Sequence, residues 1–130
     1  MGQPAAKDGD IITATDIHNE LVPNPPNVVL TPLPHQFNGI INDNLSSNVF
    51  IMGKPAATVG STAENTPPHI PLTGVFQTQP SNKATIESGS STVFINGKPA
   101  ARGGDSALTC NDPFDRPVGV ILATGTVLIG

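Results

Sequence analysis

The sequence of 130 residues has few of the large side chains that usually build a hydrophobic core, with no Trp, no Tyr and five Phe. Only 12% of its residues are charged and its formal net charge is −4, so basic clusters and stacking aromatics for nucleic-acid binding are missing. The single Cys excludes an internal disulfide and fits synthesis in a reducing cytoplasm. The sequence also lacks an apolar run long enough for a membrane-spanning helix and the basic and apolar regions of a signal peptide.

Glycine and proline are abundant instead, with 13 and 14 residues among many Val, Ile and Thr. Prolines interrupt nearly every stretch, and no segment keeps a 3.6-residue apolar period for three turns, which argues against helices. Short strands joined by tight turns are the better prediction. The length suits one domain, so the composition favours a small all-β domain with a thin core.

A repeat is the clearest pattern in the sequence. Residues 47–60 read SNVFIMGKPAATVG, and residues 91–104 read STVFINGKPAARGG. The chain begins with the second half of this pattern, GQPAA at residues 2–6, and ends with its first half, GTVLIG at residues 125–130. A third copy divided between the termini predicts that the last strand pairs beside the first, with no sheet edge left open. Three copies also predict approximate threefold symmetry within one chain.

Each copy is typical of a strand, a turn and a second strand. Val93 and Ile95 alternate with their neighbours at a period of two, and Asn96-Gly97 supplies the positive φ of a tight turn. Pro99 belongs at a strand start or edge because it lacks an N–H group. The two small alanines that follow it, Ala100 and Ala101, suit positions close to a narrow threefold axis.

The three His residues and the Cys are candidate metal ligands, since zinc prefers nitrogen and sulfur and a closed tetrahedral site needs four ligands. They are His18, His35, His69 and Cys110. Their spacing matches no local zinc finger, but three of them follow the repeat. His18 and His69 lie 14 residues after the Pro of their copies, and Cys110 lies 11 residues after its Pro. Threefold symmetry would bring these three together on the axis.

His35 lies in TPLPHQFNG, which is similar to NTPPHIPLTG around His69. We expect both segments to be loops stiffened by prolines, which could hold an imidazole in place. Four protein ligands leave no open position for water or substrate, so the pattern favours a structural site. Iron is an alternative to zinc, because ligand type narrows the choice of metal without fixing it.

Three other functions are compatible with parts of the sequence. A zinc-dependent metallohydrolase could use the three His and a water, with a nearby carboxylate as general base. The available carboxylates flank His18 or follow Cys110, and we interpret them as solvated loop residues: Asp16, Glu20, Asp112 and Asp115. A sugar-binding trefoil lacks its usual Trp and Tyr, and Cys110 as a nucleophile lacks a fixed base nearby in the sequence.

These motifs resemble those of the PAAR-repeat proteins, which are named for the tetrapeptide Pro-Ala-Ala-Arg. One copy matches the tetrapeptide in full, and the other two depart from it only at the fourth position, where they have Thr58 and Lys7. The motif residues are Pro4, Ala5 and Ala6 in one copy, Pro55, Ala56 and Ala57 in the next, and Pro99, Ala100, Ala101 and Arg102 in the complete one. The resemblance covers the whole chain. It implies a small conical, pseudo-threefold β-structure whose apex binds zinc through His18, His35, His69 and Cys110.

The resemblance also implies a structural function and not an enzymatic one. PAAR-repeat proteins cap the trimeric, β-helical VgrG-type spike of type VI secretion systems and related phage-tail-like particles, and sharpen it for membrane piercing. We therefore expect a single domain over residues 1–130 with no effector or transmembrane extension. Its partners would be the spike, carried effector proteins and the target-cell membrane. It would be assembled in the cytoplasm and then delivered outside the cell or into a target cell by the injection machine. The residues expected at the spike-binding base are Gly2, Gln3, Gly53, Lys54, Gly97 and Lys98.

Overall fold

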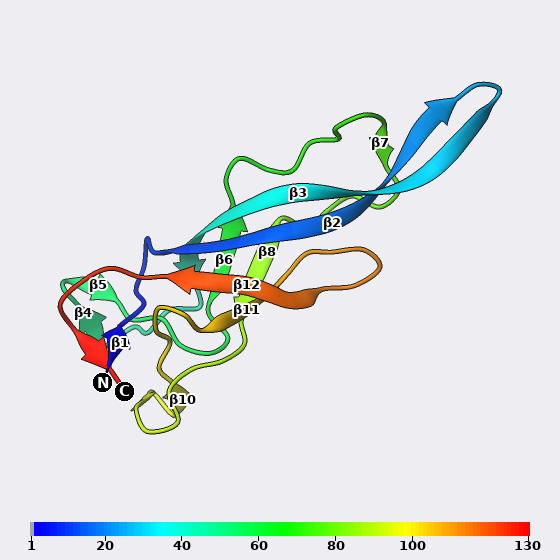
Figure 1. The fold of residues 1–130 in the computed structure, drawn as a ribbon. Helices are drawn as coiled ribbons and strands as arrows, with labels where there is room; N and C mark the ends of the chain where they lie inside the picture. The colour runs from blue at the N-terminus through cyan, green and yellow to red at the C-terminus, as the bar shows by residue number, and fades with distance from the viewer. Residues whose placement is uncertain (1) are drawn as a thin grey trace.

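The computed structural model describes residues 2–130 and is all-β over that range (Figure 1). Since these residues contain no helix, none of them forms one that is long and apolar enough to cross a membrane. Six strands have four or more residues: β2 (Ile11–Asn24), β3 (Asn27–Asp43), β6 (Thr62–Asn65), β8 (Lys83–Ile86), β11 (Ser106–Thr109) and β12 (Arg116–Leu122). Seven have two residues: β1 (Gln3–Pro4), β4 (Phe50–Ile51), β5 (Lys54–Pro55), β7 (Val75–Phe76), β9 (Phe94–Ile95), β10 (Lys98–Pro99) and β13 (Leu128–Ile129).

Three small antiparallel pairs, which we call the base, are the three copies of the repeat. They are β1–β13, β4–β5 and β9–β10. Gln3 is opposite Ile129, so the predicted closure of the third copy by the two termini is confirmed. The predicted turn at Asn96-Gly97 is also confirmed, with φ of 55° and 79° at the two residues. The termini lie together at this end of the molecule (Figure 1).

The motif prolines end the short second strand of each copy, and the first alanine of each motif follows directly. The prolines are Pro4, Pro55 and Pro99, the last residues of β1, β5 and β10, where a missing N–H group is tolerated. The first alanines are completely or almost completely buried and pack with the isoleucines of the base: Ala5, Ala56 and Ala100 with Ile51, Ile95 and Ile129. Each donates its amide to a valine carbonyl of its own copy, at 2.9 Å for Ala5 and 3.0 Å for the other two. The first alanine therefore closes its own hairpin.

The second alanine of each motif joins the copies to one another instead. The Ala6 amide donates to the Ala101 carbonyl (2.9 Å), Ala57 to Ala6 (3.0 Å) and Ala101 to Ala57 (3.1 Å). Each bond links two different copies, and the three together close a cycle, which we call the alanine ring and which confirms the threefold symmetry. All three side chains are completely buried, as expected for small residues near a narrow axis. The sequence pattern did not separate these two roles, because both alanines recur in every copy.

The longer strands form a closed ring beyond the alanines. Each copy leads into one antiparallel pair, namely β2–β3, β6–β8 and β11–β12, which we call the first, second and third units. The sheet order is β12-β11-β8-β6-β3-β2-β7, and β12 also pairs with β2. The six longer strands therefore enclose one core, and β7 of the second unit adds to β2 of the first.

The inner face of the ring changes from apolar to polar along β2. The buried positions alternate strictly from Ile12 to Glu20, as a half-buried strand requires. Ile12 packs with Phe37, Ile41, Ile86 and Ile121 in the core next to the alanine ring. The buried residues further along the same face of β2 are polar, so the core gives way there to a polar centre.

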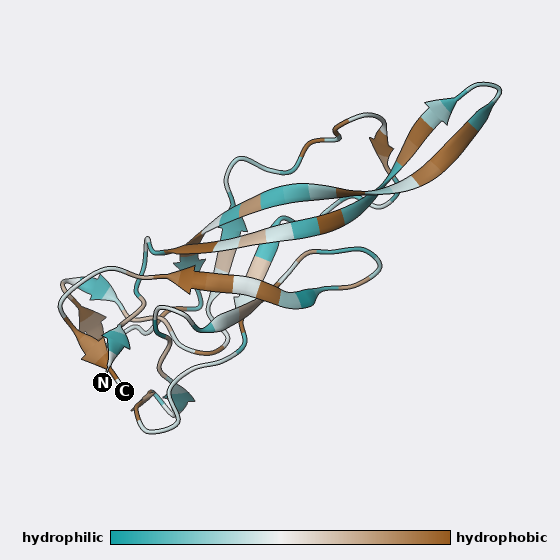
Figure 2. Cartoon of the chain, in the orientation of Figure 1, coloured by the Kyte–Doolittle hydropathy of each residue, from teal (hydrophilic) through white to brown (hydrophobic). Residues whose placement is uncertain are grey.

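The β2–β3 hairpin continues beyond the ring as a two-stranded ribbon. Its residues pair with each other as far as Asn24 and Asn27, whereas β7 pairs with β2 only at Glu20 and Leu21. Val28, Val29 and Leu30 are exposed there, and the segment between Glu20 and Asp43 contains no Asp, Glu, Lys or Arg. The ribbon lies at the end opposite the base and is coloured largely as hydrophobic in Figure 2.

Candidate metal centre

The structure brings the three histidines together inside the strand ring. His18 comes from β2, His35 from β3 and His69 from the segment between β6 and β7. The ring centroid of His18 lies 5.5 Å from that of His35 and 5.0 Å from that of His69, and the centroids of His35 and His69 are 5.5 Å apart. All three imidazoles are buried, as is Cys110, which directly follows β11.

Local backbone structure places each of these groups. His18 lies on the inner face of β2 between Asp16 and Glu20, because side chains two residues apart share a face of a strand. His35 is the register partner of Asp16 in the β2–β3 pair. Outside the strands, the amide of His69 donates to the Asn82 side-chain oxygen at 2.8 Å, which fixes the segment that carries this ring.

His18 is the most unusual of the three, because neither of its ring nitrogens has a hydrogen-bond partner within residues 2–130. Burial lowers the pKa of His18, although the nearby charge of Asp112 acts in the opposite direction. The Asp112 carboxylate is 3.6 Å from His18 Nδ1. A neutral imidazole with two unsatisfied nitrogens is a strong candidate for a metal ligand, since an unpaired buried polar group is otherwise costly.

Asp16 lies at the centre of the cluster and is completely buried. Its Oδ2 is 2.9 Å from His69 Nε2 and accepts from Cys110 Sγ at 3.4 Å. Its Oδ1 accepts from Thr109 Oγ1 at 2.5 Å and from Asn111 Nδ2 at 3.4 Å. One potential ligand atom from each of Asp16, His18, His69 and Cys110 lies within 4.8 Å of the others.

Cys110 is a buried thiol and not an exposed nucleophile. Burial raises its pKa to about 12, and the charge of Asp16 contributes in the same direction. The thiol is therefore protonated at neutral pH unless a cation displaces the proton, as metal binding does. This argues against the nucleophile interpretation and is compatible with a ligand role.

His35 is held by polar contacts of its own. Its Nε2 is 2.8 Å from Glu20 Oε2, and its Nδ1 is 2.9 Å from the Leu33 carbonyl oxygen. Burial alone would raise the pKa of Glu20, but hydrogen bonds from three backbone amides and from His35 outweigh it and lower the pKa to about 2. The amides belong to Leu72, Thr73 and Gly74.

The interpretation of Asp16 and Glu20 as solvated loop residues is wrong. Both lie on β2 and are completely buried, because the inward alternation of Ile12 and Ala14 continues through them to Glu20. That period of two was the signal in the sequence that could have placed them. Asp115 is exposed, and Asp112 is half-buried and accepts from the Asn19 amide at 2.8 Å.

The residues present fit a metal ion. Unpartnered imidazole nitrogens, a buried thiol and a carboxylate converge on one small volume, and nitrogen, sulfur and oxygen donors of this kind suit zinc or iron. A buried cluster in this all-β fold could therefore hold one cation. Asp16, and not His35, belongs with His18, His69 and Cys110 to the group of ligand atoms that lie within 4.8 Å of one another, so Asp16 and His35 are alternative fourth ligands.

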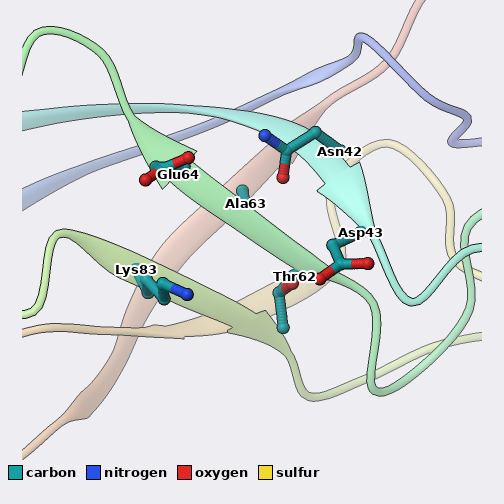
Figure 3. A pocket seen from close by; sticks show the side chains of 6 residues that line it. All are labelled: Asn42, Asp43, Thr62, Ala63, Glu64 and Lys83. Atoms are coloured by element: carbon teal, nitrogen blue, oxygen red, sulfur yellow. The ribbon is translucent and has the colours of Figure 1, made fainter.

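Two surface hollows lie at different distances from this cluster. One of about 180 Å³ is bounded by His18 and Cys110 on its inner side and by residues 78–81 and 111–115 on its outer side. The other, also about 180 Å³, is lined by Asn42, Asp43, Thr62, Ala63, Glu64 and Lys83 on β3, β6 and β8 (Figure 3). None of these six residues is one of the clustered ligands, so the second hollow is separate from the metal centre.

Comparison with protein families identifies the chain. The PAAR motif family model matches residues 15–113 and residues 77–130, which together span most of the sequence. A comparison with curated proteins found no match. With the split third repeat, the threefold alanine ring and the buried histidine and cysteine cluster, these matches establish that the chain belongs to the PAAR motif family.

Proposed function

We propose that this chain caps the blunt end of a trimeric, VgrG-like spike and forms its piercing tip. Membership of the PAAR motif family supports a spike-tip protein of the type VI secretion type in general. The capping of a particular spike, in a secretion system or a phage-tail-like particle, is the proposal. In it, residues 1–130 act as one structural domain without catalytic activity.

The observation that carries this proposal is a threefold set of apolar side chains on the base. Phe50, Phe94 and Leu128 occupy the same position in the three copies of the repeat, and 57%, 57% and 59% of their surfaces are exposed. Exposed apolar patches on small proteins commonly mark interfaces. Three equivalent contacts on one chain match the symmetry of a trimer, so a single molecule can cap three identical subunits.

The six residues expected at the spike-binding surface lie on the base hairpins or immediately beside them. Gln3, Lys54 and Lys98 are exposed, so they are available as a polar rim around the apolar positions. Phe50, Phe94 and Leu128 were not among the spike contacts expected from the sequence, and we propose them here. The sequence contained a signal for them, because each is the middle residue of the repeated Val-x-Ile triplet. Neighbouring side chains of a strand point to opposite faces, so this residue faces away from the buried isoleucine that follows it, Ile51, Ile95 or Ile129.

The metal centre has a structural role in this proposal. His18, His35, His69 and Cys110 would hold one zinc ion, which supplies a cross-link between the three units and no chemistry on a substrate. The inner face of the ring is polar at this level, so apolar packing gives little stability there. A metal that joins the units compensates for the missing core.

The ribbon of β2 and β3 would lead the tip toward a membrane. It lies opposite the base, and its exposed Val28, Val29 and Leu30 belong to a segment without Asp, Glu, Lys or Arg. An uncharged apolar point crosses a lipid surface at lower cost than a charged one. We further propose that the chain is assembled on its spike in the cytoplasm, can accompany effector proteins and is then delivered outside the cell.

The metallohydrolase alternative has less support. The hollow beside His18 and Cys110 gives it some room and is also lined by Asp112 and Asp115, but the buried carboxylates of the cluster are already engaged. Glu20 accepts hydrogen bonds from three backbone amides and contacts His35 Nε2. Asp16 accepts a hydrogen bond from Thr109 Oγ1 and contacts His69 Nε2. A general base must be able to reach the proton that it removes, and neither carboxylate is free to do so in this arrangement.

Binding of the purified chain to a purified spike trimer tests the proposal. Phe50→Asp, Phe94→Asp and Leu128→Asp should each weaken binding about 30-fold or more, as expected for the loss of about 2 kcal/mol at an interface hot spot. Val28→Asp is the matched control, because it places the same charge on an exposed apolar position at the opposite end. Equal losses from Val28→Asp, or none from the base variants, would contradict capping by the base.

A further inference from the structure

The inner face of β2 carries a carboxylate on each side of His18. Asp16, His18 and Glu20 are two residues apart, and all three point into the ring. The equivalent strands of the other units carry no buried acid at this level: β6 ends at Asn65 and β11 at Thr109. The first unit therefore supplies both buried acids among the described residues of the cluster.

Asp16 links all three units. From the first unit it contacts His69 Nε2 of the second, and it accepts hydrogen bonds from Thr109, Cys110 and Asn111 of the third. The Asn111 side chain also accepts from the Ile17 amide at 2.7 Å, which ties the third unit back to β2. Movement of this carboxylate would thus displace both His69 and the segment that carries Cys110.

Glu20 makes an analogous link between the first and second units. One oxygen is 2.8 Å from His35 Nε2 on β3 and accepts from the Leu72 amide, and the other accepts from Thr73 and Gly74 at 2.9 Å. These amides follow His69 in the chain, in a segment that outside β7 has no strand of its own. Glu20 therefore fixes the His35 ring and anchors the loop beyond His69.

We propose that Asp16 and Glu20 are positioning residues of the metal centre: Asp16 orients His69 and the Thr109–Asn111 segment, and Glu20 orients His35 and the loop after His69. Carboxylates that accept the N–H of a ligating histidine fix the orientation of the ring and increase its basicity, while the metal takes the other ring nitrogen. In His35 and His69 that other nitrogen is Nδ1, which lies 2.9 Å from the Leu33 carbonyl oxygen and 3.3 Å from Asn65 Nδ2, so metal binding would replace these two contacts. The proposal rests on metal binding by the proposed structural centre, and it is independent of the spike.

Burial argues that these acids serve the centre and not the core. A buried carboxylate is costly unless it is paired, and Ile12 and Ala14 show that this face of β2 accepts apolar residues where only packing is needed. On this face of β2 both acids lie only at the level of the histidine cluster. There, the negative charge of the two carboxylates favours a bound cation.

The test is metal affinity in the full chain, measured by competition with a chromophoric chelator for Zn²⁺ and by the absorption spectrum of the Co²⁺ form. Asp16→Asn and Glu20→Gln preserve size and remove the charge. We expect each variant to bind one metal ion with 10- to 100-fold lower affinity and to retain the thiolate-to-cobalt band. Asp43→Asn and Glu64→Gln, exposed carboxylates of the second hollow (Figure 3), should change affinity less than about twofold as matched controls.

Three results would overturn the proposal. Unchanged affinity in both variants would remove the positioning role, and lower metal-free stability with unchanged affinity would reduce it to packing. Complete loss of metal in Asp16→Asn, equal to that in Cys110→Ser, would make Asp16 a ligand instead. If Asp16→Asn does not fold, Thr109→Val, which removes the hydroxyl that holds Oδ1, should still lower affinity several-fold. If the wild-type chain binds no metal, the metal centre itself is refuted. Spike binding is tested separately, by the aspartate variants of the base.

Discussion

The base and the metal centre of this molecule differ in how strictly they obey threefold symmetry. At the alanine ring the three copies make the same hydrogen bond in turn, within 2.9 to 3.1 Å. The next layer repeats as well, since the residue after each Ala-Ala donates its amide to a side chain three residues later: Lys7 to Asp10, Thr58 to Ser61 and Arg102 to Asp105. In the copy at residues 91–104 the Arg102 guanidinium also binds Asp105, which raises the pKa of Arg102.

Symmetry is lost on the way to the metal centre. The first unit has strands of 14 and 17 residues, whereas the second has strands of four residues each. His18 and His69 lie the same number of residues after the prolines of their copies, but His18 is on β2 and His69 lies outside the strands. The third unit supplies Cys110, and the return strand of the first supplies His35. Symmetry is thus kept where the proposed partner is a trimer. It is broken where the proposed ion would need four ligands, because a threefold axis supplies equal groups only in threes.

Metal removal should separate the two regions most strongly, because we expect the metal centre, and not the base, to depend on the ion. With free Zn²⁺ at about 1,000 times its dissociation constant, chelation should remove about 4 kcal/mol from the free energy of unfolding. Hydrogen exchange should then accelerate at residues 66–82 and 110–115, and it should change little at Ala6, Ala57 and Ala101 provided that the alanine ring opens independently of the metal centre. Urea unfolding with and without chelator, followed by exchange mass spectrometry, measures both effects. Uniform acceleration over the whole chain would show that the two regions are one cooperative unit.

The symmetric region could be predicted from the sequence because its information is local. The repeat fixes the strand, turn and alanine positions, and the divided third copy fixes the pairing of Gln3 with Ile129. The clustering of His18, His69 and Cys110 followed from the same registration, whereas His35 was expected from its proline-containing segment and from the family resemblance. These features depend on residues that recur at known distances, so one copy predicts the other two.

The asymmetric region could be predicted only in part. Pro23, Pro32 and Pro34 make the segment read as loop, yet it forms β2 and β3, because these prolines lie where the hairpin has few other strand partners and a missing N–H is tolerated. The buried acids were missed for a different reason. A carboxylate at Glu20 is acceptable inside only because the Leu72–Gly74 amides, about 50 residues away, converge on it.

Larger side chains in the alanine ring test whether the three copies are also equivalent in packing. Ala6→Leu, Ala57→Leu and Ala101→Leu each add volume to a position that is completely buried, and each should cost about 1–3 kcal/mol. Because the three positions are equivalent, the three losses in urea unfolding should agree within about 1 kcal/mol, and metal affinity of the folded variants should not change. Ala123→Leu, at a half-buried position, is the control. Widely different losses would show that the ring is symmetric in hydrogen bonding but not in packing.

The smallest effect is expected at the glycines that end each turn above the ring. Gly9, Gly60 and Gly104 have φ of 92°, 96° and 90°, and a Cβ added at any of them would meet no atom within 4 Å. Replacement by Ala therefore costs only backbone strain, about 1 kcal/mol at each position. Thermal unfolding of the three variants measures the losses, with Gly130→Ala, which has open space and no positive φ, as the unaffected control. Equal losses would extend the symmetric region to the level where β2, β6 and β11 begin. A loss confined to Gly9, which precedes the long β2–β3 hairpin, would show that the asymmetry of the metal centre already starts at this turn.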